Sequence, residues 1–387
     1  MNKILCSFFV NKPNFPLKPL PLLAVMGLTT IGFTSNQAFA VEPTLVAFIG
    51  DQGVNENAQA VLQLVSDEGT DLLMIQGDFG YDDETATKWE DNLNTYLGEN
   101  FPVVGTIGNH ENFEWPAYKR FLSERLDRTD ELSCEGDIGV KATCRFRGIE
   151  IVHVAPGINN VEGVLEQDGY PEYITNEFND SNSIWRICSW HKNQQAMQVG
   201  AKSNETGWGV YQACLQQGAI VATGHEHSYS RTFLMSDFEN QTIAHKNSTM
   251  EISQGQSFAF VSGLGGREAR GQVRSDDWWA SIFTGSQNAV AGALFCRFEG
   301  DTADCYFKDI SGPVPDMFTL ISKLGTDSTA MGGDTDTVSE SVASNNNSDA
   351  NTTASSSSRK SGAVGWLFLF ALGVVSFTRV RLLSRSE

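Results

Sequence analysis

Five short apolar segments of this chain each end at a polar residue of a type that binds metal ions. The segments are Leu45–Gly50, Leu72–Gly77, Val103–Gly108, Ile184–Trp190 and Ala219–Gly224. Short apolar runs without alternation are typical of strands that are buried on both faces. Between them, residues 58–65, 85–97 and 207–217 have the pattern of helices. The sequence therefore predicts an α/β fold over residues 41–322.

The residues that follow these segments are carboxylates, an amide and imidazoles. They are Asp51, Asp78, Asn109 with His110, His191, and His225 with His227. In α/β sheets, sites collect just beyond the carboxyl ends of strands. One such residue is more often a turn or a helix cap, but five in order indicate a shared site. Carboxylates and imidazoles together suit iron, manganese or zinc, and the set is too large for one four-coordinate zinc. We expect two metal ions that share a carboxylate.

These motifs resemble those of the calcineurin-like metallophosphoesterase superfamily, in its purple-acid-phosphatase-like branch. The motifs are residues 50–53, 77–81, 108–111, 190–191 and 224–227. The assignment to the branch depends on Gly53, where many superfamily members have a metal-binding His, and on Tyr81, which follows Asp78 by three. The resemblance covers residues 45–322. It implies a four-layer αββα sandwich, with two mixed sheets between helices and a dimetal site at the carboxyl ends of the strands.

The resemblance also implies seven metal ligands, divided between two ions. One ion would be bound by Asp51, Asp78, Tyr81 and His227, and the other by Asp78, Asn109, His191 and His225. A tyrosine phenolate is a hard, anionic ligand. The first ion is therefore expected to be Fe(III), and the second Fe, Zn or Mn(II).

The expected reaction is hydrolysis of phosphate monoesters by a metal-activated hydroxide, as in acid phosphatases. His110 resembles the family histidine that contacts substrate and protonates the leaving group; alternatively, it only orients the phosphoryl group. Purple acid phosphatases commonly have another histidine about nine residues after the fourth motif. Here that region is Gly200–Ala201, with Lys192 and Lys202 nearby, which leaves pH optimum and specificity open. The alternatives to this function are a phosphodiesterase or nucleotidase on the same scaffold and a non-catalytic surface module.

Residues outside the motifs have weaker interpretations. His153 is more simply a hydrogen-bonded strand residue than a site residue. Arg267, Arg270, Trp278 and Trp279 could line the mouth of the site, but a packed loop is the favoured interpretation.

The net charge of −20 is unevenly distributed along the chain. Residues 1–40 contain three lysines and no acid, and residues 359–387 contain five basic residues and one acid, so residues 41–358 carry −27. Such an acidic body excludes binding of nucleic acid or anionic lipid through a basic surface. The expected partner is a small phosphorylated substrate, with membrane contact only through the C-terminal segment.

Both ends of the chain resemble targeting segments. Residues 1–40 combine basic residues, an apolar stretch and Ala38-Phe39-Ala40, which predicts a secretory signal peptide; an N-terminal anchor is the alternative. Residues 323–358 form a Ser-, Asn- and Thr-rich linker. Residues 359–387 contain an apolar run, Gly362–Phe377, followed by arginines. This order resembles the bacterial Gly-Gly sorting signal that a rhomboid-family protease processes, with Ser361 replacing the first glycine. A plain C-terminal anchor is the alternative.

These segments predict an exported protein at the cell surface or outside the cell, in the periplasm or on the outer face. The C-terminal segment would initially lie in the inner membrane.

Six cysteines remain after removal of the signal peptide, and export permits disulfides. A two-residue turn at Gly300-Asp301 would pair Glu299 with Thr302 and place Cys296 opposite Cys305. We therefore expect that disulfide. A Cys134–Cys144 bridge around a short loop is plausible, and Cys188 and Cys214 remain as either a disulfide or buried thiols.

Overall fold

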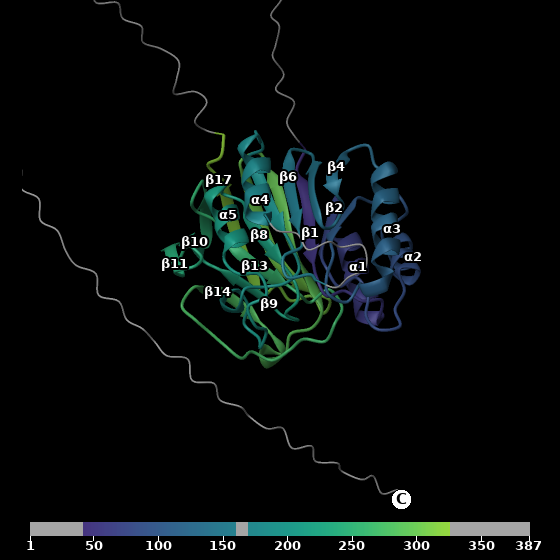
Figure 1. The fold of residues 1–387 in the computed structure, drawn as a ribbon. Helices are drawn as coiled ribbons and strands as arrows, with labels where there is room; N and C mark the ends of the chain where they lie inside the picture. The colour runs from purple at the N-terminus through teal and green to yellow at the C-terminus, as the bar shows by residue number, and fades with distance from the viewer. Residues whose placement is uncertain (1–41, 160–168, 326–387) are drawn as a thin grey trace, which may run out of the picture. The chain divides into compact units, whose positions relative to one another are not determined.

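The computed structural model describes residues 42–159 and 169–325 (Figure 1). Its first sheet has seven strands in the order β12-β17-β16-β15-β1-β2-β3. In chain order these are β1 (Thr44–Ile49), β2 (Leu72–Gln76), β3 (Val103–Thr106), β12 (Thr249–Ile252), β15 (Gly292–Glu299), β16 (Thr302–Asp309) and β17 (Asp316–Ser322). Strands β1, β2 and β3 are parallel, whereas β15 pairs antiparallel with β1, so the sheet is mixed.

The second sheet has eight strands in the order β14-β9-β13-β8-β7-β6-β5-β4. They are β4 (Leu132–Asp137), β5 (Lys141–Phe146), β6 (Ile149–Val154), β7 (Trp185–Ser189), β8 (Ile220–Thr223), β9 (Tyr229–Thr232), β13 (Ala259–Ser262) and β14 (Trp279–Phe283). Strands β6, β7, β8 and β13 run parallel, and the outer strands pair antiparallel. A separate hairpin joins β10 (Leu234–Asp237) to β11 (Thr242–His245).

The helices predicted at residues 58–65, 85–97 and 207–217 form at the expected places, and two further helices form that the sequence pattern did not predict. The helices are α1 (Glu56–Asp67), α2 (Ala86–Tyr96), α3 (Trp115–Asp127), α4 (Tyr170–Asn179) and α5 (Gly209–Gln216), with short 3₁₀ turns η1 (Asn112–Glu114), η2 (Gln195–Met197) and η3 (Gly285–Gln287). Asn55 and Thr85 cap α1 and α2, because each side chain accepts a hydrogen bond from a first-turn backbone N–H. These caps fix where both helices begin.

Alternating side chains divide the core into layers. In β1, Leu45, Ala47 and Ile49 pack in a cluster with helix residues such as Val61 and Trp89. Val46 and Phe48 point to the opposite face, into a cluster between the sheets. There the ring of Phe48 lies 5.2 Å from the ring of Phe260 of β13, centroid to centroid. The α/β prediction, with two mixed sheets between helices, is confirmed.

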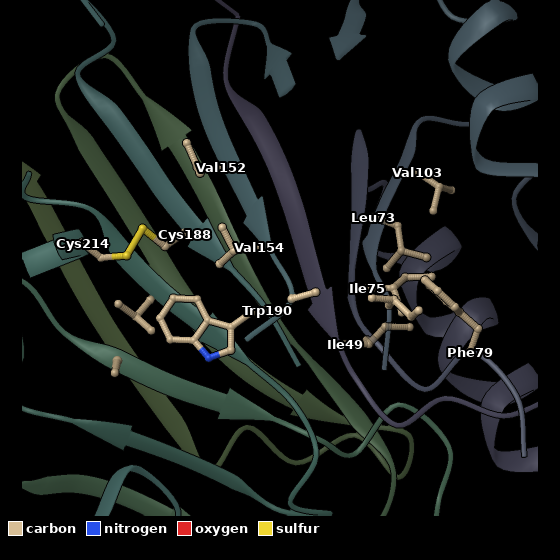
Figure 2. Close-up of a cluster of buried hydrophobic side chains, with 14 of the residues drawn as sticks. Ile49, Leu73, Ile75, Phe79, Val103, Val152, Val154, Cys188, Trp190 and Cys214 are labelled. Carbon is tan, nitrogen blue, oxygen red and sulfur yellow. A yellow bond between two sulfur atoms is a disulfide. The ribbon is translucent and has the colours of Figure 1, made fainter. Parts of the chain in front are cut away.

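Figure 2 shows part of the helix-side core. Ile49, Leu73, Ile75, Phe79 and Val103 gather at the first sheet, and Val152, Val154, Cys188, Trp190 and Cys214 gather at the second. Except for Cys214 of α5, these buried residues lie in strands or shortly after them, close to the strand ends from which the loops with Asp51, Asp78 and His191 emerge.

Three disulfides stabilise the sheets and the helix layer. The β15–β16 hairpin has the predicted register, with Glu299 opposite Thr302 and Cys296 bonded to Cys305. Cys134 of β4 is bonded to Cys144 of β5. Cys188 of β7 is bonded to Cys214 of α5, so the alternative of buried thiols is wrong. This last bridge joins a central strand to the helix that covers it.

Several predictions lie outside the described residues. They are the signal peptide over 1–40, most of the linker, and the sorting or anchor segment over 359–387. Within residues 42–159 and 169–325, no helix combines the length and apolarity needed to cross a membrane.

Candidate metal centre

The five predicted strand ends meet at one edge of the sandwich. Asp51, Asp78 and Asn109 follow β1, β2 and β3, His191 follows β7, and His225 and His227 lie in the loop between β8 and β9. Backbone hydrogen bonds join loops of the two sheets: the N–H of Gly50 donates to Ser262 (2.7 Å) and the N–H of Gly265 donates to Gly50 (2.9 Å). The loops of both sheets therefore build a single site.

One group of side chains surrounds the hydroxyl of Tyr81. Its oxygen lies 3.2 Å from Oδ1 of Asp51, 3.1 Å from Oδ2 of Asp78 and 3.5 Å from Nε2 of His227. All four residues are buried. Three oxygen donors and one imidazole nitrogen thus converge on a space the size of one ion.

A second group surrounds Nε2 of His191. This nitrogen lies 3.3 Å from Oδ1 of Asp78, 3.1 Å from Oδ1 of Asn109 and 3.1 Å from Nδ1 of His225. Asp78, His191 and His225 each offer a ligand atom, and these atoms lie within 4.8 Å of one another, as in a metal-binding cluster. Asp78 therefore contributes one carboxylate oxygen to each group.

Hydrogen bonds to the outer nitrogen of each imidazole set its orientation. Nδ1 of His191 lies 2.7 Å from the carbonyl oxygen of Gln76, and Nδ1 of His227 lies 3.2 Å from that of Glu268. Nε2 of His225 lies 2.6 Å from Oε2 of Glu205. Each outer nitrogen donates its proton to an oxygen, so the inner nitrogen keeps a free lone pair, as a metal ligand requires. The donor set therefore fits metal ions.

Three residues of the centre have left-handed backbone conformations. The φ angles are 57° at Asp51, 55° at Asp78 and 72° at His225. Such conformations cost about 1–3 kcal/mol each in residues other than glycine. One constraint that holds them is the hydrogen bond from the N–H of His225 to Oδ2 of Asp51 (2.7 Å). Strain of this kind is typical of functional sites.

The backbone at Gly108 packs directly against Asp78 and leaves no room for a side chain. A Cβ atom at this position would lie 2.1 Å from Oδ1 of Asp78. The third loop can approach the shared carboxylate this closely only because it has no side chain there.

Electrostatics distinguish the acids of the centre. Burial raises the pKa of Asp51, but the hydrogen bond and the charge of His227 lower it by a larger amount. The pKa of Asp51 therefore lies below its usual value. Burial and the charges of Asp51 and Asp78 hold the pKa of Tyr81 well above its usual value. Without a cation, Tyr81 is therefore a neutral phenol beside two carboxylates, and a bound cation would relieve this concentration of negative charge.

His110 lies at the solvent side of this centre. Its ring centroid is 4.3 Å from that of Tyr81, its backbone N–H donates to Oδ1 of Asp78 (3.0 Å), and its side chain is 38% exposed. Partial burial lowers its pKa, despite the opposing charge of Asp78. A neutral or protonated imidazole here can contact a molecule that enters from solvent.

Glu205 and Glu111 complete the surroundings. Glu111 accepts hydrogen bonds from the backbone N–H groups of Phe79 (2.6 Å) and Gly108, so it holds two of the loops together. Glu205 binds both His225 and Lys192, whose Nζ is 2.7 Å from Oε1. Sequence reasoning missed Glu205, because it lies in a long loop and belongs to no motif.

Comparisons with known proteins agree with this geometry. Residues 44–229 match the model of the calcineurin-like phosphoesterase family, and this span includes every residue of the two groups. A search of curated proteins finds no match.

Several solved structures are similar to this chain. Purple acid phosphatase PPD1 from yellow lupin (Lupinus luteus) seeds is 17% identical with a TM-score of 0.52, over 72% of this chain and 54% of that chain. The chain therefore spans about half the length of that protein. PhoD is 11% identical with a TM-score of 0.48, over 72% of this chain and 68% of that one. A dimetal phosphatase from Danio rerio is 11% identical with a TM-score of 0.41, over 73% and 99%.

Proposed function

We propose that this chain, which contains a calcineurin-like metallophosphoesterase domain, is an exported dimetal phosphatase that hydrolyses phosphate monoesters. The observation that carries the proposal is the position of Asp78. Its Oδ2 faces Tyr81 at 3.1 Å and its Oδ1 faces His191 at 3.3 Å, each within a separate group of donors. A carboxylate placed in this way can bridge two ions, as two-metal phosphatases require.

The ligand assignment follows the two groups. We assign Asp51, Asp78, Tyr81 and His227 to the first ion, and Asp78, Asn109, His191 and His225 to the second. The phenol oxygen of Tyr81 favours Fe(III) in the first position, because a ferric ion stabilises the phenolate. Fe, Zn or Mn(II) would fit the second position, whose donors are one carboxylate, one amide and two imidazoles.

When bound, two ions at these positions would supply a hydroxide nucleophile and neutralise the charge that develops on the phosphoryl group. The residues of the chain then have to place the ester and supply a proton. His110 is suited to both tasks, since its backbone is fixed on Asp78 while its ring remains partly exposed. Its imidazole would donate a proton to the leaving oxygen of the ester.

Export is supported by the cysteines and the charge. All six cysteines in the described residues form disulfides, which persist in oxidising compartments. The acidic body suits a solvent-exposed extracellular protein and disfavours binding of nucleic acid. The C-terminal segment would be the only membrane contact, before or without cleavage by a sorting protease.

A comparison of the hydrolysis rates of a phosphate monoester and a phosphate diester tests this function. The full chain, loaded with iron and with zinc or manganese, should release nitrophenol faster from p-nitrophenyl phosphate than from bis(p-nitrophenyl) phosphate, and Asn109→Ala should lose this activity. Preference for the diester would replace the proposal by a phosphodiesterase. No turnover of either ester with any of the three metals would overturn it and favour a non-catalytic module.

A further inference from the structure

The guanidinium of Arg267 lies over the ring of Tyr81. Cζ of Arg267 is 4.2 Å from the centroid of that ring, and the ring centroid of His110 lies 4.3 Å from the same point. The hydroxyl of Tyr81 faces the carboxylates of Asp51 and Asp78. Arg267 is thus a cation in direct contact with a side chain that we assign to the first metal ion.

The backbone that carries Arg267 is anchored on the loops of the metal centre. Its N–H donates to the carbonyl oxygen of Asp51 (3.1 Å), and the N–H of Arg270 donates to the carbonyl oxygen of His227 (2.8 Å). Between these two bonds, the carbonyl oxygen of Glu268 lies 3.2 Å from Nδ1 of His227. Ordered backbone therefore fixes the point from which the Arg267 side chain reaches the ring.

Gly53 leaves room for this side chain. A Cβ atom at position 53 would lie 3.5 Å from Cδ of Arg267 and 3.1 Å from Oε2 of Glu84. The φ angle of 67° at Gly53 is also one that other residues rarely adopt. A histidine at this position, as in many superfamily members, would have to share the space with Arg267. The absence of that histidine and the contact between Arg267 and Tyr81 therefore belong together.

The charge of Arg267 is not neutralised by an acid. Within residues 42–159 and 169–325, its guanidinium has no hydrogen bond and no carboxylate oxygen within 4.0 Å. Glu84, which also borders Gly53, instead accepts a hydrogen bond from the backbone N–H of Tyr81 (2.8 Å). A guanidinium over an aromatic ring is attracted by the π electrons, and a phenolate ring, which carries a negative charge, attracts it more strongly. Arg267 therefore stabilises the electrons of this ring.

We propose that Arg267 tunes the iron at the first metal position through Tyr81, by raising its reduction potential and shifting the phenolate-to-iron absorption band to shorter wavelength. This inference rests on the proposed function, in particular on Fe(III) as the ion that Tyr81 binds. A positive charge over the ring stabilises the filled orbitals of the phenolate, so less electron density reaches the ion. The Fe(III) state depends on this density more than the Fe(II) state does, and partners of metal ligands tune potentials in this way. Transfer of a ring electron to the ion also requires more energy.

Arg267→Met tests the inference on the iron-loaded full chain, because it removes the charge but keeps an unbranched side chain. We expect the absorption band to move to longer wavelength. In a redox titration with mediator dyes, in which the ion takes up one electron, the ratio of Fe(II) to Fe(III) at a given potential should fall at least tenfold. This factor corresponds to a reduction potential that is lower by about 59 mV.

Two further variants connect the effect to charge and position. Arg267→Lys keeps the positive charge and should restore both the band and the potential toward the wild-type values. Arg120→Met removes an arginine whose Cζ lies 4.1 Å over the ring of Phe121, which is not assigned to a metal, and it should leave both values unchanged. Elemental analysis and circular dichroism establish that each protein is loaded with iron and folded.

The outcomes separate this inference from the proposed function. If Arg267→Met keeps the wild-type band and potential, or if it loses the iron, Arg267 does not tune the ion and the phosphatase function stands. An unchanged band with a raised KM for p-nitrophenyl phosphate would instead assign Arg267 to substrate binding.

Two results in the wild type are also decisive. If the protein binds iron without the band but hydrolyses the ester, the assignment of Fe(III) to Tyr81 and this inference fail, while the phosphatase function stands. If the band is present and shifts in Arg267→Met but no ester is hydrolysed, the phosphatase function fails and the tuning by Arg267 stands.

Discussion

The imidazole of His225 is held from behind by Glu205, whose Oε2 lies 2.6 Å from Nε2 of the ring. The ring therefore presents Nδ1 to His191, whereas His191 and His227 present Nε2 to their groups. Glu205 is itself anchored by Lys192 and by a hydrogen bond from its backbone N–H to the carbonyl oxygen of Asn193 (3.1 Å). This chain of contacts fixes both the tautomer and the direction of one predicted metal ligand.

Removal of the Glu205 carboxylate should weaken binding at the second metal position. Loss of such a partner typically reduces metal affinity 10–100-fold. We expect Glu205→Gln to lose metal affinity by about this factor in competition with a chelator. Glu251→Gln, on the exposed face of β12, should leave the affinity unchanged. Equal metal affinity in both variants would show that Glu205 does not position His225.

Replacement of Asp78 and Asn109 should distinguish a shared ligand from a ligand of one ion. Asp78 faces both groups, whereas Oδ1 of Asn109 lies beside Nε2 of His191, in the second group. Asp78→Ala should therefore lose both ions and Asn109→Ala mainly one, as measured by elemental analysis of the purified protein. If Asp78→Ala retains one full equivalent of metal, the carboxylate does not bridge.

A visible absorption band should report the first metal position. Because burial and two carboxylates raise the pKa of Tyr81, the phenol stays protonated in metal-free protein, and a ferric ion would deprotonate it. The iron-loaded protein should be coloured, and Tyr81→Phe should lose the band with the fold retained by circular dichroism. A colourless, iron-free and fully active protein would contradict Fe(III) at Tyr81.

His153 should make the fold sensitive to acid. It is buried in β6 with no hydrogen-bond partner for either ring nitrogen in the described part of the chain, and burial lowers its pKa to about 4. Between that value and the usual 6.5, the unfolded state binds more protons than the folded state. The neutral His153 therefore costs the fold no stability above pH 6.5, and the free energy of unfolding falls as the pH drops below this value. The loss should reach about 3 kcal/mol.

Urea unfolding of His153→Leu at pH 7.5 and 4.5 measures this effect. The variant should gain stability relative to the wild type, and the gain should be larger at pH 4.5. A gain that does not depend on pH would show that His153 does not titrate on unfolding.

The sequence predicted those features that depend on local pattern. The register of β15 and β16 follows from the turn at Gly300. The positions of Asp51, Asp78 and His191 follow from apolar strands whose carboxyl ends lie at the same edge of the fold. Glu205 and Lys202 lie in a loop whose path depends on distant contacts, such as those of Val199 with residues 273 and 274. No local pattern specifies such contacts.

His153 shows a second limit of prediction from the amino-acid sequence. Its apolar neighbours correctly predicted a buried strand, but we expected a hydrogen-bonded ring, and within the described residues neither nitrogen has a partner. Whether a buried polar group finds a partner depends on the packing of side chains from other strands, which one segment does not contain.

The left-handed backbone at Asp51, Asp78 and His225 sets stability against activity. Glycine at any of the three positions would relax the chain but delete a donor of the centre, so selection for a sturdier fold and selection for chemistry act in opposite directions there. Bound ions stabilise only the native state. The resistance of this protein to unfolding and proteolysis should therefore follow the supply of metal in its surroundings.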